Sequence, residues 1–200
     1  MHFGSRTPNY KTMREQRRNH REGDVERAPS LRLFYALWPD EPTRGRLEAL
    51  QSGIVGRKVD SANLHLTLAF LGNQPRESLM LLESVMQSLI VHPFTLTIDS
   101  YGYFSKPRVV WVGPSSPPEA LISLQRTLWQ SLLDNGIPLK PSADFRPHVT
   151  LARGVRCASL PRLGSPLDWS VREFVLLESI PQAMHPRYEV RAVFPLYPDN

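Results

Sequence analysis

Two short segments of this chain carry the same chemistry-bearing residues at the same spacing. Residues 65–68 read His-Leu-Thr-Leu, residues 148–151 read His-Val-Thr-Leu, and an alanine follows each. With 6 His and 8 Thr in 200 residues, chance would place a Thr two positions after a His about 6 × 8/200 ≈ 0.24 times. Two such matches therefore predict one active site built from two equivalent parts.

The residue types in these motifs are suited to acid–base chemistry at a phosphate. Side chains alternate along a strand, so His65 and Thr67 should point the same way, as should His148 and Thr150. In-line displacement at phosphorus needs one group to take a proton and another, across the phosphorus, to give one. Histidine can do either near neutral pH, and Thr hydroxyls can donate to the phosphate oxygens.

Other interpretations of the same residues are weaker. A single strand histidine is usually structural, but two copies in matched positions favour catalysis. A metal site is not expected, because His-x-Thr lacks the spacing of zinc ligands and no Cys/His cluster is present. Cys157 lies in an unpatterned segment and is not expected to be a nucleophile. His92 and His185 each precede a proline in expected loops, and we expect no chemical role for them.

The surrounding sequence predicts alternating strands and helices. Apolar runs typical of strands occur at 31–37, 94–98, 109–112, 171–177 and 188–194. The helical spacing of apolar residues predicts three helices. Asp40 would cap the first, Pro75 would open the second, and Ser116 would cap the third, with Glu119 completing a capping box. Each half then contains a helix, a His-x-Thr strand and two further strands, which predicts a duplicated α+β unit.

Composition sets the limits on location and partners. Residues 1–29 are rich in alternating charges and poor in apolar periodicity, which predicts a disordered basic tail before a domain at 30–200. The tail could be a nucleic-acid-binding arm, a solvated segment or an upstream start artefact, with Met13 as an alternative start. The net charge of +5 favours an anionic partner, and one cysteine with no membrane-length apolar run suits the cytoplasm.

At this point the chain resembles a known family, the 2H phosphoesterases, and in particular the LigT-like RNA 2′,3′-cyclic phosphodiesterases, historically called 2′-5′ RNA ligases. The resemblance covers about residues 31–196 and excludes the tail. Its stretches are 33–39 (LFYALWP), 63–72 (NLHLTLAFLG), 107–113 (PRVVWVG), 145–153 (FRPHVTLAR) and 187–190 (RYEV).

The resemblance implies a bilobal α+β fold, with two pseudo-symmetric antiparallel sheets and flanking helices around a central groove. It also implies metal- and cofactor-free hydrolysis of a 2′,3′-cyclic phosphate at an RNA end, or of a cyclic nucleotide, to a 2′-phosphomonoester. His65 would be the acid and His148 the base.

Further site residues follow from the same resemblance. Thr67 and Thr150 would hold the phosphate oxygens. Arg153 matches a phosphate-binding arginine, although strict alternation would put it on the face opposite Thr150. Phe70 stands at the equivalent place in the first motif. Apart from the resemblance, the aromatic side chains Phe34, Tyr103, Phe104 and Tyr188 could stack a base or lie in the core, and we expect Phe34 and Tyr188 to stack it. The protein is expected to be a monomer. Reverse ligation to a 2′-5′ linkage and a binding module with little turnover remain as alternatives.

Overall fold

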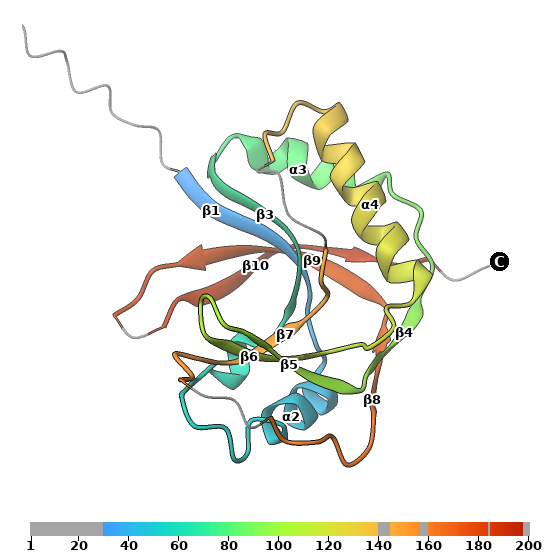
Figure 1. Ribbon diagram of the computed structural model, residues 1–200. Coiled ribbons are helices and arrows are strands. Elements are labelled where there is room, and N and C mark those ends of the chain that lie inside the picture. Colours follow the sequence, from blue (N-terminus) through green and yellow to red (C-terminus); the bar gives the residue numbers. More distant parts are fainter. Residues whose placement is uncertain (1–29, 140–144, 157–159, 184, 198–200) are drawn as a thin grey trace, which may run out of the picture.

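The computed structural model describes residues 30–139, 145–156, 160–183 and 185–197, which form an α+β fold (Figure 1). The tail at 1–29 and Cys157 lie outside the described residues, so the predictions about them stay predictions. The strands are β1 (Ser30–Leu37), β2 (Arg57–Lys58), β3 (Leu66–Pro75), β4 (Phe94–Ile98), β5 (Ser100–Phe104), β6 (Val109–Gly113), β7 (Val149–Arg153), β8 (Leu167–Val171), β9 (Glu173–Ile180) and β10 (Arg187–Pro195). The helices are α2 (Glu41–Ala49), α3 (Ser78–Gln87), α4 (Glu119–Asp134) and the short 3₁₀ helix η1 (Ser61–Asn63).

The two motif strands meet at equivalent residues. The larger sheet has the order β10-β9-β1-β3-β7-β6-β5, with β2 also paired to β7, while β4 and β8 form a separate two-stranded sheet. In the ladder between β3 and β7, Leu66 pairs with Val149. Each of these residues directly follows its motif histidine, so the two paired positions are equivalent in the two motifs. A two-fold axis through this pair would relate one motif to the other. The pairing therefore supports the predicted pseudo-symmetry.

The chain exchanges strands between the two halves of this sheet. We call β10-β9-β1-β3 the first lobe and β2-β7-β6-β5 the second lobe. β5 and β6 follow the first motif in sequence but pair in the lobe of the second motif, and β9 and β10 do the reverse. Neither lobe is thus a continuous piece of chain, which ties both motifs into one unit.

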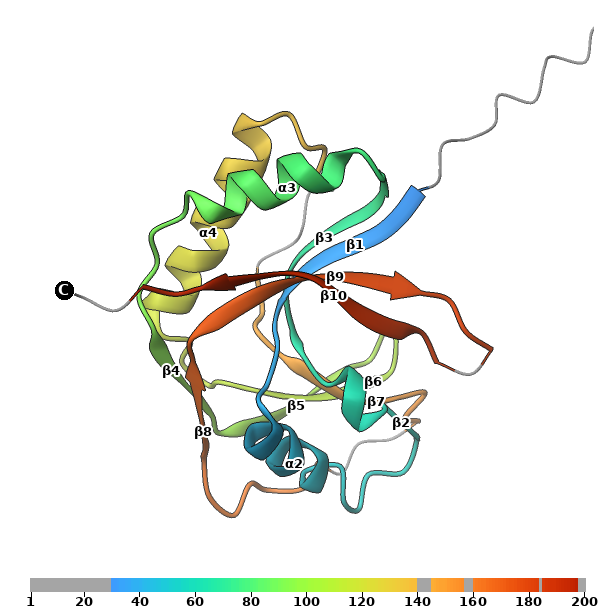
Figure 2. The same cartoon turned by 180° about the vertical axis from the view of Figure 1, so that it is seen from behind.

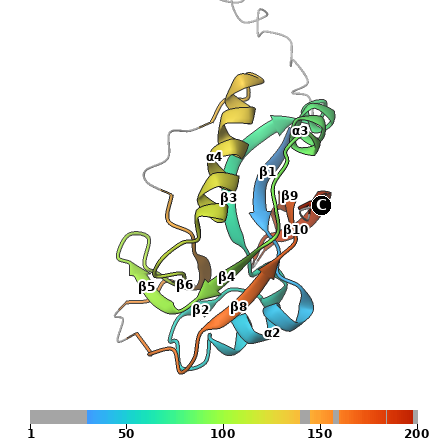
Figure 3. The same cartoon turned by 90° about the vertical axis from the view of Figure 1, so that its right-hand side faces the viewer.

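The helices lie at opposite ends of the molecule. In Figures 1 and 3, α3 and α4 lie together at one end, and α2 lies at the other. The hydroxyl of Tyr35 on β1 donates to the Leu82 carbonyl of α3 at 3.0 Å, and that of Tyr101 on β5 donates to the Leu50 carbonyl after α2 at 2.8 Å. These bonds attach α3 to the first lobe and the segment after α2 to the second lobe.

Two of the three predicted helix starts are wrong. Asp40 caps α2 as predicted, because its carboxylate accepts from the Thr43 backbone N–H at 2.9 Å. Pro75 instead ends β3, where it pairs with Ser30, and α3 begins only after a turn. The N-cap of α4 is Pro118 and no side chain caps it, so the predicted capping box at 116–119 does not form.

The two faces of β1 contact different apolar clusters. Leu33, Tyr35 and Leu37 belong to the main core, which runs continuously through both lobes. Phe34 and Ala36 point to the opposite face, where they pack with Val175 and Leu177 of β9 in a small cluster. This second face is the one on which the motif residues lie.

A β-bulge interrupts both motif strands at the same position. In β3, Ala36 pairs with Thr67 and Tyr35 pairs with Ala69, so Leu68 is an extra residue. In β7, Trp111 pairs with Thr150 and Val110 with Ala152, so Leu151 is extra. An extra residue reverses the alternation of side chains beyond it. Matched bulges thus redirect the residue that lies three positions after each threonine.

Side chains from other segments stabilise both bulges. The Trp129 indole N–H on α4 donates to the Leu68 carbonyl at 3.3 Å. The Gln51 side-chain amide donates to the Leu151 carbonyl at 3.0 Å and to the Val59 carbonyl at 2.7 Å. Each bulge carbonyl therefore accepts a hydrogen bond from a side chain outside the two motif strands, and the Leu151 carbonyl also accepts one from the Val59 backbone N–H.

Candidate active site

The backbone orients both motif histidines in the same way. Nδ1 of His65 lies 2.6 Å from the carbonyl oxygen of Asn63, and Nδ1 of His148 lies 2.7 Å from that of Arg146. A carbonyl can only accept, so Nδ1 of each ring must carry a proton. In the neutral ring, Nε2 then keeps its lone pair, and it is the nitrogen available for proton transfer.

Aromatic rings surround His65. Tyr188 stands perpendicular to it with ring centroids 5.2 Å apart, Phe34 lies 5.1 Å away, and Trp38 is stacked at 6.2 Å. This apolar setting excludes water from much of the imidazole.

His148 has a matching environment. Phe104 stands perpendicular to it with centroids 5.1 Å apart, and Trp111 lies 5.9 Å away. Gly102 makes this possible, because a Cβ there would lie 2.0 Å from the Trp111 ring. The indole therefore lies flat against β5.

Both histidines are neutral at physiological pH in this environment. Burial, with a smaller contribution from the nearby charge of Arg153, lowers the pKa of His65 from 6.5 to about 4. Burial and Arg153 likewise lower the pKa of His148. Charge on His148 also lowers the pKa of His65, so the two rings are close enough to interact. The site thus contains two neutral bases until an anion enters it.

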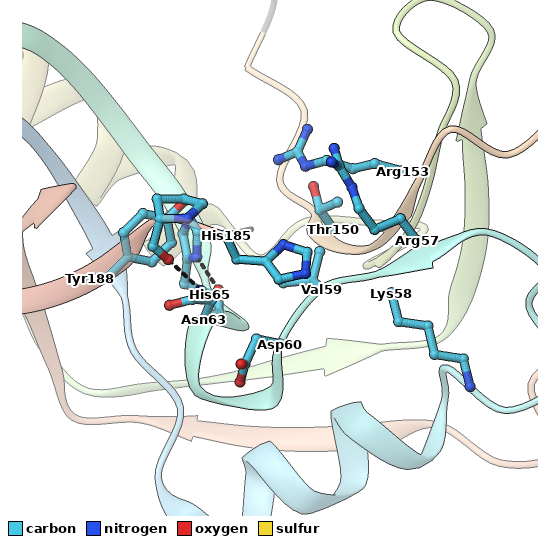
Figure 4. A pocket seen from close by; sticks show the side chains of 11 residues that line it. Arg57, Lys58, Val59, Asp60, Asn63, His65, Thr150, Arg153, His185 and Tyr188 are labelled. Carbon is cyan, nitrogen blue, oxygen red and sulfur yellow. Dashed lines mark hydrogen bonds between the residues drawn. The ribbon is translucent and has the colours of Figure 1, made fainter. Parts of the chain in front are cut away.

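The bulge in β7 places Arg153 on the same face as Thr150. Their partners on β6, Val109 and Trp111, are two residues apart and therefore share a face. Arg153 and Thr150 accordingly line one pocket together with His65 (Figure 4). The conflict between strict alternation and a phosphate-binding role for Arg153 is removed by the bulge.

The matching bulge in β3 places Phe70 beside the first motif. Phe70 pairs with Phe34, and its ring is 62% exposed with its centroid 5.6 Å from that of Phe34. Phe34 itself is 1% exposed, so it cannot stack a base as the sequence suggested. The buried Phe34 ring instead packs against the rings of His65, Phe70 and Tyr188.

The pocket draws residues from both lobes. The first lobe and its hairpin supply His65, Tyr188 and His185, and the second lobe supplies Thr150 and Arg153, with Arg57 beside them. His148 and Thr67 are outside its lining; Thr67 is half-buried on β3. Burial raises the pKa of Tyr188, so its phenol remains a hydrogen-bond donor.

Two of these lining residues were missed from the sequence. His185 was expected to have no role because it precedes a proline, and Arg57 carried no motif. The Asn63 side chain donates to the Pro186 carbonyl at 2.8 Å, which holds the segment of His185 against the residues before His65. This contact joins positions 123 residues apart, and no local pattern indicates it.

Neither a metal cluster nor a membrane helix is found in the described part of the chain. No group of three His, Cys, Asp or Glu side chains there could hold a metal ion. Among the same residues, no helix is long and apolar enough to cross a membrane.

Comparison with known proteins agrees with this geometry. An RNA 2′,3′-cyclic phosphodiesterase of Escherichia coli is 39% identical over 156 residues, which cover 74% of this chain and 86% of that protein. One of Archaeoglobus fulgidus is 32% identical over 178 residues, 82% of this chain and 99% of its own. The crystal structure of Escherichia coli LigT with 3′-AMP matches with a TM-score of 0.78 at 31% identity, covering 84% of this chain and 99% of LigT. Residues 39–180 match the 2′-5′ RNA ligase superfamily, to which this chain therefore belongs.

Proposed function

We propose that this chain hydrolyses RNA 2′,3′-cyclic phosphate ends to 2′-phosphomonoesters, and that His65 and His148 carry the two proton transfers. The observation that carries the proposal is the matched pair of histidines, each fixed through Nδ1 with Nε2 available, on strands that meet at Leu66 and Val149. The relatives named as RNA 2′,3′-cyclic phosphodiesterases support the same reaction.

The reaction balances with these two groups alone. Nε2 of His148 takes a proton from water as its oxygen attacks phosphorus. The bond from phosphorus to the ribose 3′ oxygen breaks, and protonated His65 gives that oxygen its proton. The phosphate remains on the 2′ oxygen. Each assisted transfer contributes roughly 10²–10⁴-fold to the rate.

The remaining residues hold the substrate. Thr67 and Thr150 donate to the non-bridging phosphate oxygens, where charge grows in the transition state. Arg153 pairs with the same charge. Phe70 and Tyr188 take the base-stacking role, because Phe70 presents an exposed ring and Tyr188 lines the pocket.

One chain supplies both motifs, so a monomer would be complete. We therefore propose that the protein acts as a monomer. We also propose a cytoplasmic location. The names of the relatives favour hydrolysis over 2′-5′ ligation, and ligation is not proposed as the main activity.

The decisive experiment uses an oligoribonucleotide that ends in a 2′,3′-cyclic phosphate, in EDTA. The wild-type protein should produce a 2′-phosphate, and His65→Ala and His148→Ala should each lower turnover by at least ~100-fold without unfolding. Tight binding without turnover by the wild type would instead identify a binding module. Loss of activity in EDTA that a divalent ion restores would overturn the metal-free mechanism.

A second substrate separates the acid from the base. With sulfur in place of the bridging 3′ oxygen, the leaving thiolate does not need a proton. His65→Ala should then recover most of its lost rate, whereas His148→Ala should not. Recovery of His148→Ala alone would show that the two roles are exchanged.

A further inference from the structure

The pocket contains more positive charge than one phosphate requires. Arg57 on β2 pairs directly opposite Arg153 on β7. Figure 4 shows their guanidinium groups side by side above Thr150. Like charges opposite one another destabilise a strand pair, and within the described residues no acidic side chain forms an ion pair with either arginine. Such an arrangement is favourable when anions bind between and beside the two groups.

The fold holds Arg57 in this place. A Cβ on Gly56 would lie 2.8 Å from the Val155 side chain and 3.2 Å from the Arg153 carbonyl, so glycine lets β2 approach β7 closely. The Val59 backbone N–H donates to the Leu151 carbonyl at 2.9 Å, and the Gln51 side-chain amide donates hydrogen bonds to the carbonyls of both residues. The strand that carries Arg57 is thus attached to the bulge that directs Arg153.

The opposite wall of the pocket comes from the β9–β10 hairpin. Figure 2 shows this hairpin extending toward the side of the molecule where β2 and β7 lie. His185 at its end faces the same pocket as Arg57. The ion pair of Arg191 on β10 with Glu178 on β9 joins the two strands of the hairpin, and Asn63 fixes its end through the Pro186 carbonyl.

The reacting phosphate does not need Arg57. It carries one negative charge, and Arg153 together with the protonated acid histidine already supplies two positive charges beside it. Arg57 lines the pocket together with His65 and with His185 (Figure 4), whose imidazole can also donate a hydrogen bond. A second phosphate, one nucleotide away along the strand, is the anion that an RNA end brings and a cyclic mononucleotide lacks.

We propose that Arg57 and His185 form a second phosphate subsite, which binds the 5′ phosphate of the terminal nucleotide and makes the enzyme prefer RNA ends over cyclic mononucleotides. This inference rests on the proposed function, because it assumes that the cyclic phosphate lies between His65 and His148. It assigns substrate length selection to β2 and the hairpin rather than to the motif strands.

Two substrates that differ only at the 5′ position test the subsite. They are adenosine 2′,3′-cyclic phosphate and the same nucleotide with a 5′ phosphate. Wild-type kcat/KM should be higher for the 5′-phosphorylated substrate. Arg57→Ala should lower that value roughly 10- to 100-fold, the effect of removing a charged hydrogen-bond partner, and change the other less than about twofold. Arg57→Lys should recover part of the loss.

The matched control for Arg57→Ala lies on α4, away from the pocket. Arg126→Ala on the exposed face of that helix removes the same charge and should change neither kcat/KM. Equal losses on both substrates in Arg57→Ala would mean that Arg57 serves the reacting phosphate, and no loss on either would mean that no subsite exists. Either result would overturn the proposal.

A binding measurement keeps the test independent of turnover. Adenosine 2′,5′-bisphosphate should bind the wild-type protein more tightly than adenosine 2′-phosphate, and Arg57→Ala should remove the difference. The preference of the wild type for the bisphosphate should also weaken as the salt concentration rises, because it depends on an added charge–charge contact. If the wild type turns over neither substrate but the bisphosphate preference depends on Arg57, the proposed function fails and the subsite stands. Equal Kd values for the two ligands would refute the subsite itself.

Discussion

The depressed histidine pKa values make the pH dependence of this site a sharp test of its mechanism. kcat/KM reports the groups of the free enzyme, and kcat reports those of the complex. In the free protein the pKa of His65 is about 4 and that of His148 lies below its ordinary value. The acid must be protonated and the base neutral, so the pH profile of kcat/KM should be bell-shaped. Its maximum should lie on the acidic side of pH 6.5.

The bound phosphate should reverse this depression. Lowering the pKa of His65 from 6.5 to about 4 corresponds to about 3 kcal/mol against the protonated ring. A phosphate anion one hydrogen bond away, at a charge separation of about 4 Å and an effective dielectric constant of about 20, contributes about 4 kcal/mol in favour of it. The two effects are of similar size and opposite sign, so substrate binding should return the pKa of His65 toward its ordinary value. The maximum of kcat should therefore lie at higher pH than that of kcat/KM.

Steady-state rates from about pH 4 to 9, together with NMR titration of the His65 ring, would check both steps. The titration should move to higher pH when adenosine 2′-phosphate is added. In the free protein, Arg153→Ala should also raise the pKa of His65, because it removes a nearby positive charge. Coincident maxima for kcat and kcat/KM, or a His65 titration that ligand does not move, would refute the electrostatic reasoning.

Two further predictions concern the residues that shape the motif strands. Gln51→Leu removes a buried amide that donates to the Leu151 carbonyl of the bulge and to the Val59 carbonyl, and it should lower the free energy of unfolding by about 1–3 kcal/mol and raise KM. Gln130→Leu, on the exposed face of α4, is its matched control, and an equal loss in both would contradict the role of the bulge. Gly102→Ala inserts a methyl group into the Trp111 ring and should cost about 1–3 kcal/mol in chemical denaturation while lowering kcat. Gly164→Ala meets nothing within 4 Å and should change neither quantity.

The local chemistry of this site could be predicted from the sequence because it depends on short-range rules. Strand alternation places His65 with Thr67 and His148 with Thr150, and the repeat of the motif indicates one site with two equivalent parts. The N-cap at Asp40 could also be predicted, since Asp40 and the backbone N–H that its carboxylate accepts from lie within one turn of the helix. The incorrect helix starts show the limit of such rules: Pro75 opens no helix because its backbone continues a ladder with Ser30.

What the sequence could not predict depends on contacts between distant segments. The pairing of Arg57 with Arg153 requires β2 to join β7, and nothing near residue 57 indicates that partner. The exchange of β5 and β6 for β9 and β10 between the lobes is equally invisible, because a strand pattern does not name its neighbour. His185 reaches the pocket through such a distant contact, at Asn63.

The bulges explain why two equivalent motifs can act on an asymmetric substrate. The two-fold arrangement gives each histidine a backbone carbonyl two residues earlier as acceptor and a perpendicular aromatic ring, so these contacts do not distinguish acid from base. Three residues beyond each threonine, the matched bulges direct Phe70 and Arg153 to the site face. One of these positions offers an exposed ring and the other a cation, which suit a base and a phosphate. The difference that orients the substrate thus lies at a position whose direction only the bulge determines.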